Sequence, residues 1–201
     1  MSLSMGITSM KEILVAVALA SLGSFAEAQE ATEATKLPPA TKLEAFSART
    51  GIVVIRAFTT VGVVNGMGRV TIDAREFRDA SNPKIREYGI AVTVKESGRL
   101  ERENTSFIDY DEIDSLVRGI DYIAKVDKSI TSMNDFEAHY KTKGDFTITT
   151  FSAGGRDINV AVSSGRIGRT SAFLKLSDLG QIKSLIADAK AKIDAAKAAA
   201  K

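Results

Sequence analysis

The chain has 201 residues, 44% hydrophobic and 26% charged, with a formal net charge of +2, which is typical of a soluble globular protein of one domain or two small ones. The near balance of charge argues against a dedicated nucleic-acid or membrane-surface binder, which usually carries a marked basic excess. Cysteine is absent, which excludes disulfides, thiolate metal sites, cysteine nucleophiles and a cysteine-linked lipid anchor.

Residues 1–28 have the pattern of a secretory signal peptide. Lys11 precedes a run of small apolar residues over 13–20, and Ala26-Glu27-Ala28 supplies the small-x-small pattern of a cleavage site. The run is shorter than the roughly 20 apolar residues that a membrane-spanning helix needs. The alternative is a buried N-terminal helix, but the run has no polar face. We therefore expect cleavage after Ala28, a polar linker over 29–41, an extracytoplasmic mature protein (periplasmic or secreted) and no stable membrane insertion after cleavage.

An internal repeat organises the rest of the chain. Three pairs of similar segments occur in the same order, which chance does not readily produce. The pairs are 86–92 with 156–162, 97–102 with 164–169, and 105–108 with 170–174. The repeat predicts two related halves, 42–130 and 131–201, packed as one globular unit.

Several short segments alternate apolar with polar or small residues, which is the pattern of half-buried strands. The segments expected to form strands are 52–55, 70–74, 88–94, 136–140, 146–151 and 158–162. Glycine-containing turns separate many of them. The four consecutive apolar residues over 52–55 predict a strand covered on both faces, preceded by a short helix over 43–48.

Each half is expected to end in an amphipathic helix. Apolar residues recur at helical spacing over 113–124 and over 179–193. Asp109 or Asp111 is the expected cap of the first helix, and Ser177 that of the second. The predicted fold class is therefore α+β: two related halves, each of about four antiparallel strands followed by an amphipathic helix packed on the sheet. The helix of each half is the obvious cover for its own strands.

The densest acidic cluster comprises Asp109, Asp111, Glu112 and Asp114. Such carboxylates can ligate calcium, but the segment lacks the loop glycine and the distal glutamate of an EF-hand. Acidic residues also stabilise the positive end of a helix dipole, and a helix is expected to begin here. We favour helix capping over a metal site.

The sequence predicts no catalytic residue, no metal site and no cofactor. His139 is the only histidine, which excludes multi-histidine zinc sites, and we interpret it as a partly exposed sheet residue. No serine lies in a nucleophile-elbow pattern. The glycines over 62–68 precede a strand, whereas a phosphate-binding loop requires a helix N-terminus.

The arginines of the repeat are the sharpest candidates for a binding site. Arg99 and Arg102 in the first half correspond to Arg166 and Arg169 in the second. If the halves pack with pseudo-twofold symmetry, the four guanidinium groups could converge on an anionic ligand, since guanidinium binds carboxylate or phosphate bidentately. The alternative, which we favour from sequence alone, is that they are solvated charges on hairpins that pair with neighbouring carboxylates.

The order of four strands and a helix, taken twice, resembles the Whirly class of single-stranded nucleic-acid binders, which carry two such repeats. The resemblance is one of element order, and under it Phe151, Phe173 and Tyr140 would be the aromatic side chains to consider for base stacking. Export and the near-neutral charge argue against nucleic acid, and fold analogy does not carry function.

Our main hypothesis is an exported, non-enzymatic module of unknown specific function. It would bind a small anionic molecule or a macromolecular partner such as a protein, or serve structurally in the cell envelope. A hydrolase of unfamiliar type is the further alternative. It would require His139 beside a carboxylate and a hydroxyl in a cleft.

Overall fold

The computed structural model describes residues 38–98, 101–152, 154 and 157–200. The predicted signal peptide, most of the predicted linker and Arg99 lie outside the described residues. Residues 39–201 form one compact unit, to which all the elements below belong. Within the described ranges, no helix is both long enough and apolar enough to cross a membrane.

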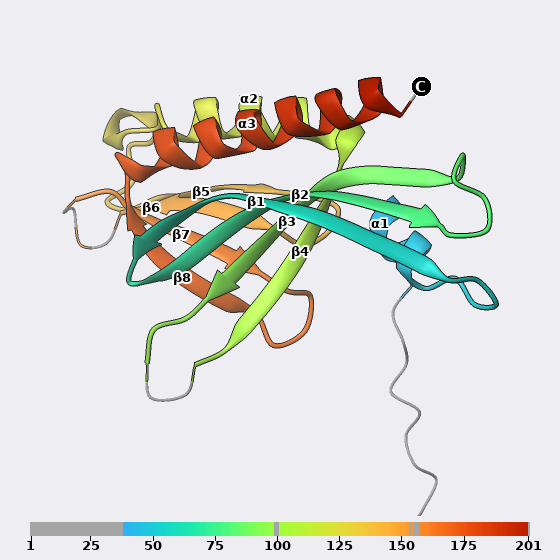
Figure 1. Ribbon diagram of the computed structural model, residues 1–201. Helices are drawn as coiled ribbons and strands as arrows, with labels where there is room; N and C mark the ends of the chain where they lie inside the picture. The colour runs from blue at the N-terminus through green and yellow to red at the C-terminus, as the bar shows by residue number, and fades with distance from the viewer. Residues whose placement is uncertain (1–37, 99–100, 153, 155–156, 201) are drawn as a thin grey trace, which may run out of the picture. The chain divides into compact units, whose positions relative to one another are not determined.

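Two four-stranded antiparallel sheets, each followed by a long helix, confirm the predicted α+β fold (Figure 1). Sheet A has the order β1 (Val54–Gly66), β2 (Gly68–Asp79), β3 (Arg86–Lys95) and β4 (Glu103–Asp109). Sheet B has the order β5 (Glu137–Lys141), β6 (Thr147–Phe151), β7 (Asn159–Ser164) and β8 (Thr170–Lys175). The α-helices are α1 (Lys42–Ser47), α2 (Ile113–Ile123) and α3 (Asp178–Ala199), and short 3-10 turns span Tyr110–Glu112 and Lys128–Ile130.

The sequence repeat falls on the last two strands of each sheet. The repeated segment 97–102 connects β3 to β4, and its counterpart 164–169 connects β7 to β8. The two hairpins therefore occupy corresponding positions in the two halves.

The apolar faces of both sheets and both long helices share a single core. Alternate residues of each strand face this core, as the pleat requires. The buried cluster includes Ile72, Val92, Ile148, Val162, Leu116 and Ile186. The core is therefore common to the two halves.

The long helices cover the sheets, but each lies mainly on the sheet of the other half. Helix α3 packs on β1, β2 and β3 of sheet A, while α2 packs on β5 and β6 of sheet B and along α3. Close approaches mark both contacts, at Gly62 of β1 against Leu185 of α3 and at Gly119 of α2 against Tyr140 of β5. The expectation that each helix would cover the sheet of its own half is corrected by this exchange, which interlocks the two halves.

Asp109 anchors α1 rather than capping the helix that follows it. Its carboxylate is almost fully buried and accepts hydrogen bonds from the backbone N–H of Lys42 to both oxygens, at 2.9 and 3.0 Å. The residue at the start of α2, Glu112, and Ser177 at the start of α3 make no side-chain capping hydrogen bond. The predicted cap of α2 was therefore wrong, whereas Ser177 does occupy the N-cap position of α3, without a side-chain capping bond.

The first strand is longer and more exposed than the sequence predicts. It extends from Val54 to Gly66 and forms an outer strand of sheet A. Val53 is 69% exposed and Phe58 is 63% exposed. The prediction of a strand covered on both faces over 52–55 was wrong, because this segment leads into an edge strand.

Replacing Gly119 by alanine is expected to destabilise the protein, although alanine is the better helix former. An added Cβ would lie 2.3 Å from a ring carbon of Tyr140, and the ring is held against the core. We expect Gly119→Ala to lower the free energy of unfolding by about 1–3 kcal/mol in urea denaturation, as overpacking does.

Gly180 of α3 provides the matched control, because no atom lies within 4 Å of its Cβ position. Gly180→Ala should leave the free energy of unfolding unchanged or raise it by up to about 1 kcal/mol. Equal losses of stability in the two variants would contradict the packing of α2 on β5.

Candidate functional site

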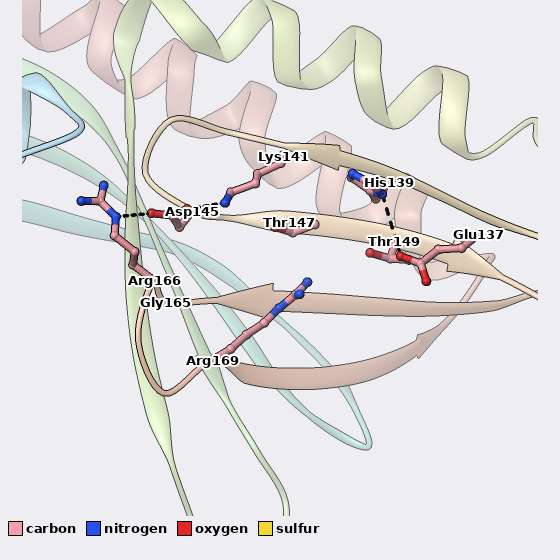
Figure 2. Close-up of a pocket in the computed structure, with 9 residues that line it drawn as sticks. All are labelled: Glu137, His139, Lys141, Asp145, Thr147, Thr149, Gly165, Arg166 and Arg169. Atoms are coloured by element: carbon pink, nitrogen blue, oxygen red, sulfur yellow. Dashed lines mark hydrogen bonds and ion pairs between the residues drawn. The ribbon is translucent and has the colours of Figure 1, made fainter. Parts of the chain in front are cut away.

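A groove of about 280 Å³ lies on the outer face of sheet B (Figure 2). Strands β5 and β6 form its floor, and the loop between β7 and β8 forms one wall. The side chains that line it include His139, Lys141, Asp145, Thr147, Thr149, Arg166 and Arg169. Sheet B thus presents its core face to the helices and a polar, hollowed face on the other side.

The strand register brings four of these side chains onto the floor. His139 of β5 pairs with Thr149 of β6, and Lys141 pairs with Thr147. Because successive side chains of a strand alternate between faces, these four share the outer face, whereas Tyr140 lies on the core face. Thr147 and Thr149 are each only 7% exposed and line the groove, so they belong to its floor.

Asp145 closes one end of the groove and pairs with two cations. It lies in the β5–β6 turn with a φ of 63°, in the left-handed region. Its carboxylate lies 2.6 Å from Lys141 Nζ and 2.6 Å from Arg166 Nε. Burial opposes ionisation of Asp145, but the hydrogen bonds from Arg166 and Lys141 outweigh it and hold the pKa of the carboxyl below its ordinary value.

Arg169 is the cation of the groove that this carboxylate does not neutralise. Its side chain is exposed and extends over the groove, apart from the ion pairs of Asp145 (Figure 2). It makes no ion pair or side-chain hydrogen bond with any residue in the described ranges. Arg169 therefore leaves guanidinium donors available in the groove that Thr147 and Thr149 also line.

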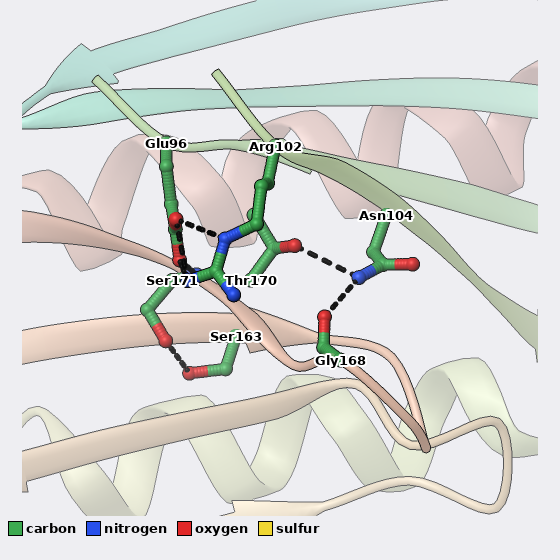
Figure 3. Close-up of polar contacts among 7 residues, drawn as sticks. All are labelled: Glu96, Arg102, Asn104, Ser163, Gly168, Thr170 and Ser171. Atoms are coloured by element: carbon green, nitrogen blue, oxygen red, sulfur yellow. Dashed lines mark hydrogen bonds and ion pairs between the residues drawn. The ribbon is translucent and has the colours of Figure 1, made fainter. Parts of the chain in front are cut away.

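Arg102 lies outside the groove, at the β8 edge of sheet B (Figure 3). Its guanidinium donates to Glu96 at 2.9 and 3.2 Å, and Glu96 in turn accepts a hydrogen bond from the Ser171 backbone N–H at 3.0 Å. Nearby, Asn104 donates to the Gly168 carbonyl at 2.6 Å. These bonds hold the β3–β4 hairpin against the β7–β8 hairpin, which gives Arg102 a structural partner.

The four predicted arginines are thus divided. Arg166 and Arg169 line one groove, Arg102 belongs to the link between the sheets, and Arg99 lies outside the described residues. Lys141, Thr147 and Thr149 were not among the residues predicted from the sequence. The alternation of apolar and polar residues in β5 and β6 indicates their position, because it places them on the face opposite the core.

His139 has a carboxylate and a hydroxyl beside it, but not in a catalytic arrangement. Its Nδ1 is 3.8 Å from Glu137 Oε1, which is longer than a hydrogen bond. Both side chains are well exposed, so water screens the pair. A nucleophile and its base require hydrogen-bond contact and an orienting partner. His139 and Glu137 therefore do not form a hydrogen-bonded pair in the groove.

The acidic cluster that was weighed as a calcium site is dispersed among separate partners. Asp111 pairs with the Lys42 ammonium, Glu112 accepts from the Lys143 backbone N–H, and Asp114 pairs with Lys190 of α3. In the part of the chain that the structure describes, no group of three or more acidic or histidine side chains could hold a metal ion.

Comparison of the chain with known protein families, with curated protein sequences and with solved structures found no match. The groove is the feature of the described residues with the clearest binding chemistry. The groove combines the guanidinium of Arg169, two cations that pair with the Asp145 carboxylate, and two threonines on the floor.

Asp145→Asn is expected to lower the free energy of unfolding by about 1 kcal/mol at pH 7, because it removes two charge-assisted pairs. Asparagine tolerates the left-handed backbone conformation of residue 145, so the substitution removes the negative charge without adding backbone strain. The folded-state pKa of Asp145 is lowered, so its contribution is complete above the unfolded pKa of about 4 and is lost as the pH falls through the folded pKa. Urea denaturation at a series of pH values should show the two proteins converging in acid.

The matched control is Asp157→Asn, since Asp157 is exposed and has no ion pair within the described residues. This change should alter stability by less than about 0.5 kcal/mol at every pH. If the Asp145→Asn deficit were the same at low and neutral pH, the backbone rather than the ion pairs would be responsible.

Proposed function

We propose that this protein is an exported, non-enzymatic binding module that takes a small anion in the groove on sheet B. The observation that carries the proposal is that Arg169, a cation without a carboxylate partner among the described residues, lines the same groove as the nearly buried Thr147 and Thr149. Guanidinium and hydroxyl donors together suit the oxygens of a carboxylate, sulfate or phosphate group.

The charge around the groove supports an anion rather than a cation. The groove is lined by the basic side chains of Lys141, Arg166 and Arg169, against the carboxylates of Glu137 and Asp145. Asp145 holds Lys141 and Arg166 at the rim, so a ligand meets an arranged set of cations rather than free side chains. The volume of about 280 Å³ suits a small molecule, being near the lower end of the usual range for ligand sites.

The Whirly-like alternative has one supporting feature, the aromatic side chain of Phe173. It is 46% exposed and lies on the outer face of sheet B, in the same row as Thr149. Tyr140, in contrast, packs in the core against Gly119. A surface that binds single-stranded nucleic acid needs several aromatic side chains for base stacking and a row of basic side chains for the phosphates. We therefore favour a small anion over nucleic acid as the ligand.

The binding proposal predicts that Arg169→Gln weakens anion binding about tenfold or more, because it removes a charged hydrogen-bond donor. Isothermal titration calorimetry of the folded protein with sulfate and with succinate measures the effect.

Arg102→Gln is the matched control, since Arg102 is the repeat counterpart of Arg169 but lies outside the groove. It should leave affinity unchanged. Equal weakening by the two arginine variants would contradict the groove as the site. Binding of single-stranded DNA that weakens steeply with salt and is lost in Phe173→Ala would instead support the Whirly-like alternative.

Export rests on the pattern of residues 1–28, and it predicts a mature protein that begins at Gln29. N-terminal sequencing of protein recovered outside the cytoplasm checks this directly. Ala28→Tyr places a large residue at the cleavage position and should cause the uncleaved chain to accumulate. Ala31→Tyr, just beyond the site, should leave cleavage intact. Recovery of mature protein that still carries residues 1–28 would contradict the proposal.

A further inference from the structure

The outer strands of a sheet carry backbone N–H and C=O groups that can pair with another chain, so proteins usually protect them. Strand β8 is protected by sheet A. Its Phe173 exchanges two backbone hydrogen bonds of 2.9 Å with Met67, and its Ser171 N–H donates to Glu96. Strand β5 is short and carries the charged or polar side chains of Glu137, His139 and Lys141.

Strand β4, the other edge of sheet A, lies against the second half of the chain. Asn104 donates from it to the β7–β8 loop, and the Phe107 carbonyl faces Gly144 so closely that a Cβ on that glycine would lie 2.0 Å away. Three of the four outer strands therefore have a covered or charged edge.

Strand β1 has no such protection over residues 54–60. The Val53 carbonyl accepts a hydrogen bond from Ala80 N–H at 3.0 Å, so by the antiparallel alternation the odd-numbered residues bond to β2. The even-numbered residues, among them Arg56 and Phe58, direct their N–H and C=O groups away from the sheet. No residue in the described ranges pairs with these groups, and β1 contains no acidic side chain.

We propose that β1 pairs antiparallel with β1 of a second copy, across a twofold axis at Ala57. Within one copy, Arg56 lies over the Phe77 ring at 5.6 Å and Arg75 over the Phe58 ring at 4.5 Å. The pairing places Arg56 opposite Phe58 of the second copy, and the reverse, which extends this row of alternating guanidinium groups and rings across the axis. A twofold at Arg56 would instead set like charges against each other. The pairing is isologous, as in most homodimers, and the bulge after Thr60 ends the regular segment.

A crevice beside β1 accommodates a side chain from the second copy. It has a volume of about 130 Å³ and is lined by Ala57 and Thr59 of β1 and by Ile193 and Ala196 of α3, among others. The proposed twofold sets Ile55 of the second copy opposite Thr59, on the face that bears this crevice. An apolar side chain that is 36% exposed in one copy would thereby gain apolar contacts in the pair.

The natural absence of cysteine gives a direct test. Ala57→Cys places one thiol at the axis, where the two Cβ atoms of an antiparallel pair come within reach of a disulfide. Under mild oxidation this variant should form a covalent dimer on a non-reducing gel. Thr105→Cys, exposed on β4, should remain monomeric. Equal cross-linking of the two variants would overturn the proposal.

A second measurement examines the noncovalent dimer by light scattering with size-exclusion chromatography. Phe58→Pro removes an outward N–H without removing a bond to β2, so the folded variant should elute as a monomer while the unsubstituted protein elutes as a dimer. If the proline variant does not fold, Phe58→Lys serves instead, because it sets a lysine opposite Arg56 of the second copy and the two positive charges repel each other. A monomeric unsubstituted protein at its highest soluble concentration, or a dimer that persists in either folded variant, would overturn the proposal. Neither outcome bears on the anion groove, which lies on the other sheet.

Discussion

The packing of each long helix on the sheet of the other half is the constraint on which the rest of the structure depends. A four-stranded sheet with one apolar face cannot be stable until that face is covered. Here the cover of sheet A is α3, which the chain supplies only after the second sheet is complete. The two halves therefore bury their apolar faces together, and a chain without disulfides obtains one large core instead of two small ones.

The same packing decides which surfaces are left to the solvent. Both helices occupy the core side of the sheets, and ion pairs such as Lys183 with Asp121 hold them together. The outer face of sheet B is then open, and the β7–β8 loop is free to form a wall over it. On sheet A, α3 lies along β1 but leaves its outward backbone groups uncovered. The groove and the exposed edge are thus two consequences of one arrangement.

Local patterns in the sequence predict the helices and strands, but they do not predict which sheet each helix packs on. The alternation of apolar residues and the repeat at 97–102 and 164–169 were sufficient to predict two related halves of strands and a helix. Nothing in the apolar stripe of a helix distinguishes one apolar sheet from another, so the exchange of α2 and α3 could not be derived. Asp109 shows the same limit, since the N–H that it binds, that of Lys42, lies far away in the chain. Asp109 is buried against the start of α1 because of tertiary packing. This packing overrides the local sequence pattern that predicted Asp109 as a helix cap.

The two hairpins of the repeat differ in whether the second arginine has a carboxylate partner. When Ser97-Gly98 is aligned with Ser164-Gly165, Arg102 corresponds to Arg169 and Glu96 corresponds to Ser163. In the first half, Glu96 accepts two hydrogen bonds from Arg102 and fixes it to the edge of β8. In the second half, Ser163 offers a hydroxyl that is already bonded to Ser171 at 2.9 Å. The two hairpins also differ in register, because Glu96 lies across from Arg102 whereas Ser163 pairs with Ser171 and not with Arg169. The first hairpin therefore holds its second arginine in an ion pair, and the second hairpin leaves Arg169 at the groove.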